Sequence, residues 1–164
     1  MAKPVKAGEA YTLSGPLAKV HPAASRDLGL VFGWGMVCNV RGQDGVMRKY
    51  FDLQRHHIPD EAMLRNGLEF ASGLRVSGEM HLTDQDGESV EKGFYPYLFP
   101  MTEQIAKGYG MTITQSGLMV CSKPTPDVLE RFDSGEYTGF SIGGTFSRDA
   151  LIDVEIDEDE AVFS

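Results

Sequence analysis

Two stretches of the chain alternate apolar and polar residues, and this alternation predicts half-buried strands. Over residues 74–83 every second position is apolar or glycine, and the intervening positions are Arg75, Ser77, Glu79, His81 and Thr83. Because successive residues of a strand point to opposite faces, we expect His81 on the polar face. Residues 151–156 alternate in the same way and predict a closing strand.

Denser apolar runs predict further strands over residues 28–40, 46–51, 90–99 and 111–121. Glycine interrupts the first run at Gly33 and Gly35 and the last at Gly117, and glycine inside a strand is typical of a bulge or a close backbone approach. Pro96 removes a ladder donor, so we expect the strand over 90–99 at the edge of its sheet.

Three segments carry the start and stop signals of helices. Pro59 precedes two acids, and apolar residues then recur with a roughly helical period until Ser72-Gly73; we expect the buried face to be formed by Met63, Leu64, Leu68 and Phe70, together with Ala62 and Ala71. Thr102 is a cap for a short helix through Tyr109. Thr125 and Pro126 open a third helix.

These elements predict a mainly β protein with a few short helices, an α+β fold. Most connections suit antiparallel pairing, so we expect a closed or nearly closed antiparallel β-barrel with helices around it. Residues 1–27 contain scattered Gly and Pro without a period, and we expect an extended N-terminal arm. The barrel domain is then expected over 28–158, and 159–164 form an acidic C-terminal end.

Composition fits one soluble globular domain. The chain has 164 residues, of which 41% are apolar and 24% charged. The N-terminus lacks the apolar stretch of a signal peptide, and we expect no membrane association. Two cysteines, Cys38 and Cys121, lack metal-like spacing, which favours a reducing cytosolic compartment.

Charge is concentrated near one end. The net charge is −9, and residues 153–160 carry six acids and no base. The chain shows no basic patch of the kind that binds nucleic acid, so we expect no nucleic-acid partner.

One serine lies in a glycine-containing run that favours strand, residues 136–146. Phe140 and Ile142 share one face, so Ser141 is expected on the other. Its surroundings match G-x-S-x-G, but the nucleophile elbow of α/β-hydrolases needs a following helix and a later histidine. All four histidines precede Ser141, which excludes that class. If Ser141 is a nucleophile, its base therefore comes from earlier in the chain; otherwise Ser141 is an ordinary surface serine.

The chain resembles the prohead (capsid-maturation) serine proteases of tailed phages, in the XkdF-like branch. The resemblance covers residues 28–162: the opening strand at 31–35, the block at 52–70, a histidine ending the next strand at His81, and a closing strand at 151–162. Its most specific part is the serine block, Ser-Gly-Glu-Tyr-Thr-Gly-Phe-Ser-Ile-Gly-Gly, at residues 134–144.

The resemblance implies an assemblin-like barrel and an endopeptidase that cleaves scaffolding and capsid proteins, and itself, inside the immature phage head in the host cytoplasm. It implies Ser141 as nucleophile and His81 as base, without cofactor or metal. Aligning the closing strand gives Glu158 as the third catalytic residue. The apolar alternation of that strand favours Glu155 instead, and Asp153 is a further alternative. The oligomeric state stays open.

Three other interpretations compete with this one. The same fold without activity would be a structural head-assembly module. Three histidines, His56, His57 and His81, would be the ligands of a metal site, although their spacing does not favour one. Cys121 would be an alternative nucleophile, but a cysteine in the middle of a strand is usually a packing residue.

Overall fold

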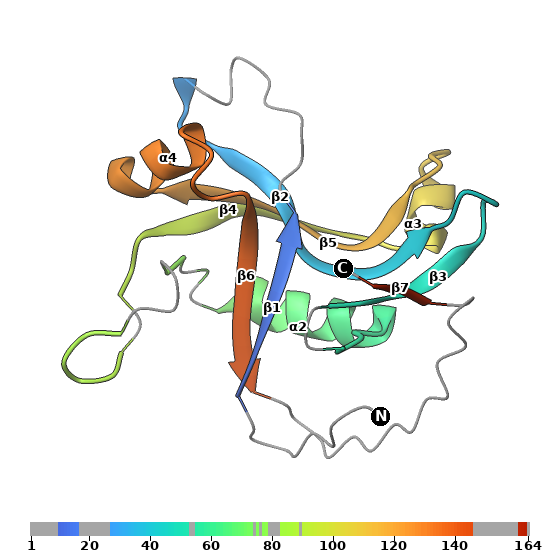
Figure 1. Cartoon of the computed structure of the whole chain (residues 1–164), viewed down its shortest axis with the longest axis horizontal. Coiled ribbons are helices and arrows are strands. Elements are labelled where there is room, and N and C mark those ends of the chain that lie inside the picture. The colour runs from blue at the N-terminus through green and yellow to red at the C-terminus, as the bar shows by residue number, and fades with distance from the viewer. Residues whose placement is uncertain are drawn as a thin grey trace.

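The computed structural model describes residues 10–16, 27–52, 55–73, 75, 77–78, 83–88, 90–145 and 161–163. The fold is mixed α+β and mainly β, as predicted (Figure 1). Of the predicted elements, the strand over 151–156 lies outside the described residues, and the strand over 74–83 is described only in part.

A five-stranded sheet has the order β4-β5-β2-β3-β7. Its strands are β2 (Val31–Arg41), β3 (Met47–Phe51), β4 (Gly93–Met101), β5 (Gln115–Pro124) and β7 (Ala161–Phe163). The first four are antiparallel, whereas β7 pairs parallel with β3. Residues 161–163 thus belong to the sheet, although an end outside the core was expected there.

A second, two-stranded sheet pairs β1 (Ala10–Pro16) with β6 (Gly139–Thr145). Both strands contact β2, and the pair runs across the direction of the larger sheet (Figure 1). Residues 1–27 were expected to form an extended arm outside the core, but residues 10–16 form a strand paired with β6. Backbone pairing does not require an apolar period, so the sequence pattern did not reveal this strand.

The expected barrel is also wrong within the described part of the chain. There the sheet is open, with β4 at one edge and β7 at the other. Pro96 and Pro100 lie in β4, and proline is confined to edge strands because it lacks a backbone donor. Among the described strands β4 is an edge strand, as predicted from Pro96, although the backbones of Arg75 and Ser77 bond to its first residues. The same proline works against closure through β4.

The predicted irregularity at Gly117 is confirmed. Its φ is +153°, and the pairing of β2 with β5 shifts register beside it. A Cβ at this position would overlap the carbonyl oxygen of Met36 on the neighbouring strand. Glycine is required here because the two backbones approach too closely for a side chain.

All three predicted helices are present: α2 (Asp60–Ser72), α3 (Glu103–Gly108) and α4 (Pro126–Asp133). Thr102 caps α3, its side-chain oxygen accepting from the Ile105 amide at 3.1 Å. No helix in the described part of the chain is long and apolar enough to cross a membrane.

Helix α2 buries a narrower stripe than expected. Met63 and Gly67 are buried, whereas Leu68 is 68% exposed. Gly67 packs on β5, where an added Cβ would lie 3.2 Å from a methyl of Leu118. The buried stripe of α2 is therefore centred on Gly67, the small residue that lets the helix approach the sheet.

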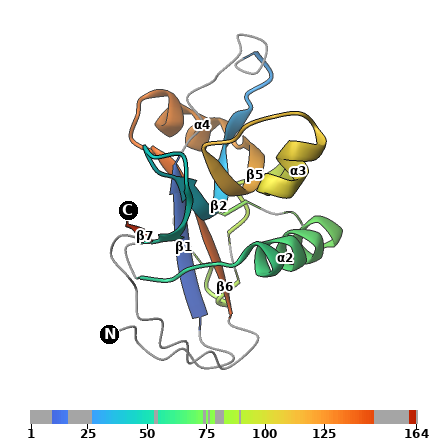
Figure 2. The same cartoon turned by 90° about the vertical axis from the view of Figure 1, so that its right-hand side faces the viewer.

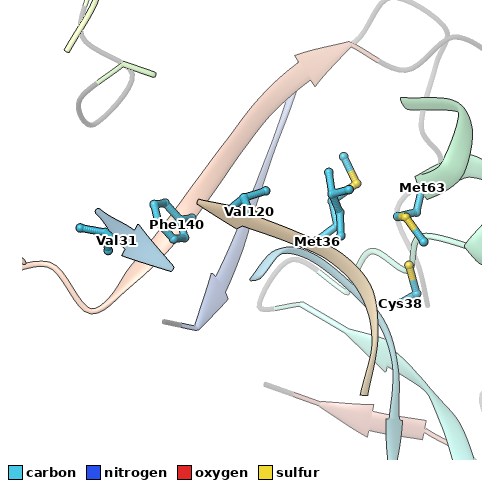
Figure 3. Close-up of a cluster of buried hydrophobic side chains, with 7 residues drawn as sticks. Val31, Met36, Cys38, Met63, Val120 and Phe140 are labelled. Atoms are coloured by element: carbon cyan, nitrogen blue, oxygen red, sulfur yellow. The ribbon is translucent and has the colours of Figure 1, made fainter. Parts of the chain in front are cut away.

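The core lies between the larger sheet, α2 and β6. In Figures 1 and 2, α2 is on the same side of that sheet as the β1–β6 pair. Figure 3 shows the cluster of buried side chains, which comprises Val31, Met36, Cys38, Met63, Leu118, Val120 and Phe140. Phe140 is the contribution of β6, so the residue next to Ser141 is a core residue.

Candidate active site

Ser141 lies in the middle of β6, and the segment before that strand is firmly held. Helix α4 ends at Asp133, and Gly135 then turns the chain at φ +78°. The Gly135 amide donates to the Phe132 carbonyl at 3.1 Å, and the Tyr137 amide donates to the Arg131 carbonyl at 3.0 Å. The left-handed conformation favours glycine, which explains this residue of the serine block.

Phe140 anchors β6 in the core. It is 6% exposed, and its ring centroid lies 5.7 Å from that of Phe132 and 6.1 Å from that of Tyr95. Such aromatic pairs add to the free energy of burial. The backbone at Ser141 is therefore held by its neighbour Phe140, and it lies opposite Ser14 of β1.

His81 lies outside the described residues, as do Glu158, Glu155 and Asp153. The chain that leads to His81 is described at two positions beside β4. The Tyr95 amide donates to the Arg75 carbonyl at 2.9 Å, and the Ser77 amide donates to the Gly93 carbonyl at 2.9 Å. These bonds are of the kind that a strand next to β4 would make.

The predicted turn after His81 is present. The Asp84 amide donates to the Glu88 carbonyl at 2.8 Å, and Gly87 has φ +81°. A turn at this point returns the chain toward β4, which begins at Gly93. The segment that contains His81 thus follows residues that are bonded to the edge of β4 and precedes a turn.

Tyr95 contacts both the chain before His81 and the residue before Ser141. Its backbone bonds Arg75, and its ring contacts Phe140, the neighbour of Ser141. His81 is four positions after Ser77, which limits their Cα atoms to about 14 Å apart. Burial raises the pKa of Tyr95, and a hydrogen bond with the Ser77 side chain opposes that rise. Tyr95 is therefore a neutral packing residue at pH 7.

A second group of polar residues, Asp52 and His56, was not predicted from the sequence. Asp52 is 6% exposed; its Oδ1 accepts from the His56 amide at 2.8 Å, and its Oδ2 lies 3.8 Å from His56 Nδ1. The only signal in the sequence is an aspartate four residues before a histidine in a short loop.

The two side chains border a small cavity together with Gly35, Met36, Val37, Tyr50 and Ile58. Its volume is about 10 Å³, which is room for a group the size of one water molecule. A carboxylate beside an imidazole can orient the ring, but the cavity is too small for a peptide substrate. This pair fits a role in holding the loop between β3 and α2.

His57, the next residue, has different partners. Its Nδ1 lies 3.0 Å from the Tyr50 carbonyl oxygen, and its ring packs on Phe51 at 5.5 Å. Burial is the main cause that lowers its pKa. Among the described residues no three ligating side chains come together around a metal position, so His56 and His57 are explained by their own contacts; His81, the third residue of that interpretation, is not described.

A third polar cluster fixes the first turn of α2. Asp60 Oδ1 accepts from Ser116 Oγ at 3.0 Å and from Asn39 Nδ2 at 3.2 Å. Burial, followed by the charge of Asp60, raises the pKa of the Cys38 thiol. Asp60 thus links α2 to both β2 and β5.

Cys121 does not fit the role of a nucleophile. It is 1% exposed, and burial raises its pKa to about 11. The thiolate is the reactive form of cysteine, and at neutral pH this thiol stays protonated and shielded. The packing interpretation of Cys121 is the one that its environment supports.

Comparison with known proteins adds no relative. No family model matches the chain, no curated protein matches it, and no solved structure matches it. Fold and residue geometry therefore carry the functional argument, together with the resemblance in the serine block.

Proposed function

We propose that this chain is a serine endopeptidase in which Ser141 attacks a peptide carbonyl. The observation that carries the proposal is the serine block, residues 134–144. Its turn, its buried phenylalanine and its strand together hold the backbone around Ser141. Gly135 makes the turn, and Phe140 anchors the seven-residue strand β6 in the core. A nucleophile needs a backbone held in one position so that the attack distance is set in advance.

His81 is the proposed base. A serine hydroxyl is a weak nucleophile until a base takes its proton, and that base needs an acidic partner to orient it. Glu158 is proposed for the partner, with Glu155 as the alternative. The shared contact at Tyr95 supports the proposal, because the chain that leads toward His81 and the strand that carries Ser141 meet there.

Scaffolding and capsid proteins of a tailed phage are the proposed substrates, cut inside the immature head in the host cytoplasm. This part rests on the resemblance of residues 28–162 to the prohead proteases. The alternative, an inactive head-assembly module on the same fold, predicts a folded protein that cuts neither substrate.

The test is to mix the protein with its virus's scaffolding and capsid proteins and to follow the cut products by mass spectrometry. Ser141→Ala should reduce the rate on the order of 10⁴–10⁶-fold, as loss of a nucleophile does. Ser134→Ala is the matched control, because Ser134 opens the same block but its hydroxyl bonds the Arg131 carbonyl. A folded Ser141→Ala protein that still cuts at the native rate contradicts the assignment.

A further inference from the structure

Strand β6 has one strand partner among the described residues, and that partner is the N-terminal strand β1. The two are antiparallel in a continuous register from Ala10 opposite Thr145 to Pro16 opposite Gly139. Ser14 lies directly opposite Ser141. Facing residues of antiparallel strands have Cα atoms about 4.5–5.5 Å apart, so β1 runs along the backbone edge beside the proposed nucleophile.

That edge is of the kind to which an extended polypeptide adds. Peptides commonly bind by adding a strand to a sheet, where main-chain hydrogen bonds supply affinity without requiring a particular sequence. The seven residues of β1 already occupy the edge of β6 in this way. A substrate that adds here must therefore take the place of β1.

The composition of the pair favours exchange. Glycine occupies one position in β1 and three in β6, and glycine weakens a strand because it has no side chain to pack. Pro16 ends β1 without a backbone donor. A two-stranded sheet is marginally stable by itself in water, so contacts with β2 supply much of what retains β1.

We infer that β1 is a displaceable strand, which occupies the edge of β6 to which an extended polypeptide substrate adds and thereby restrains the enzyme. That the incoming polypeptide is a substrate rests on the proposed function, whereas the exchange of β1 itself does not. A tethered strand competes at an effective concentration on the order of millimolar. Added peptides therefore bind weakly until β1 leaves.

The test locks β1 in place reversibly. Ala10→Cys with Thr145→Cys joins facing residues at the far end of the pair from Pro16, at a Cα separation that a disulfide spans. The native Cys38 and Cys121 are buried, which keeps them from competing for the bridge. The probe is a fluorescent peptide with the sequence of residues 9–17, and anisotropy measures its binding in a Ser141→Ala background.

The oxidised double-cysteine protein should bind the peptide at least tenfold more weakly than the same protein after reduction. Each single-cysteine variant is a matched control and should not respond to reduction. Equal binding by the oxidised and reduced proteins, including no binding by either, overturns the inference; equal measurable binding would mean that the peptide adds elsewhere, such as to the other edge of β6.

The same pair of proteins, with Ser141 restored, separates this inference from the proposed function. If reduction restores peptide binding but neither form cuts scaffolding or capsid protein, strand exchange stands and the endopeptidase proposal fails. If both forms cut at the same rate, the endopeptidase stands and the restraint by β1 fails.

Discussion

Gly117 carries a severe backbone constraint, because any side chain at its position would overlap the Met36 carbonyl on the adjacent strand. We expect Gly117→Ala to lower the free energy of unfolding by about 3 kcal/mol, through strain in a conformation that L-residues avoid and through separation of β2 from β5. For a chain of this size that is a fall of roughly 6–12 °C in melting temperature.

Gly108 supplies the control for that experiment. It is the last residue of α3, has no positive φ, and has open space where a Cβ would be. Gly108→Ala should leave the melting temperature unchanged or slightly higher, as alanine favours helix over glycine. A Gly117→Ala protein as stable as the native chain would mean that the bulge relaxes freely.

His57 should make stability depend on pH. Burial lowers its pKa below 6.5, a smaller effect of Lys49 acts in the same direction, and the Tyr50 carbonyl and Asp60 oppose it. The unfolded chain therefore binds the proton more readily than the folded protein does. The stabilising contribution is complete above about pH 6.5 and is lost as the pH falls below that value.

We expect the melting temperature to fall between pH 7.5 and pH 5, and to fall less in His57→Gln, which has no imidazole to protonate and keeps a donor for the Tyr50 carbonyl. Differential scanning calorimetry at both pH values measures the fall in melting temperature of each protein. A fall of the same size in both proteins would assign the pH dependence to other groups.

At the scale of elements, Asp60 determines how α2 docks. Asp60→Ala would leave the hydroxyl of Ser116, which is 0% exposed, without its acceptor, and would leave Asn39 with Ser116 Oγ as its remaining acceptor in this cluster. Hydrogen bonds to a charged group contribute about 1.5–3 kcal/mol, so we expect a melting temperature lower by on the order of 5–10 °C.

Glu61→Ala is the matched change, since Glu61 is the next acid in the same first turn and is exposed. It should lose only the helix-dipole contribution, about 0.3–1 kcal/mol. Equal losses in the two variants would show that the polar cluster contributes nothing beyond the charge at the start of the helix.

Elements with local signals were predictable from the sequence. Pro59, Thr102 and Pro126 marked the three helices because caps and proline act on neighbouring residues. Strand β1 was not predictable, because its only signal is pairing with a partner that lies more than a hundred residues later. Leu68 was misassigned for a related reason: Gly67, a residue without apolar character, determines which face of α2 packs on β5.

For the whole molecule, stability should vary with the number of neighbouring strands. β5 has β4 on one side and β2 on the other, whereas among the described strands β1 pairs with β6 alone. We expect amide hydrogens of β5 to exchange at least about a hundredfold more slowly than those of β1, because local opening frees the least-supported strands first. Hydrogen exchange with mass spectrometry measures both segments, and equal protection would make β1 a permanent part of the core.

The overall architecture was only partly predictable. The strands β2, β3, β4 and β5 and the edge position of β4 followed from apolar runs and Pro96, but the arrangement of strands did not. An open sheet and a barrel use the same alternating pattern, and the difference lies in which edges meet. The same holds for the candidate site: the order of Ser141 and the histidines along the chain excludes the hydrolase elbow, whereas which distant residues meet depends on long-range strand pairing, which no local pattern encodes.

Pro96 and Pro100 also bear on how crowded copies behave. Head-to-tail growth into a filament would join β4 of one molecule to β7 of the next, and β7 is only three residues long. Prolines in edge strands lie where the missing N–H faces away from the sheet, so a docking strand would find two gaps in the ladder along β4. Part of the β4 edge is also taken by backbone bonds to Arg75 and Ser77. Among the described strands, neither edge offers a full-length template for polymerisation, so we expect copies at high concentration to resist joining edge to edge.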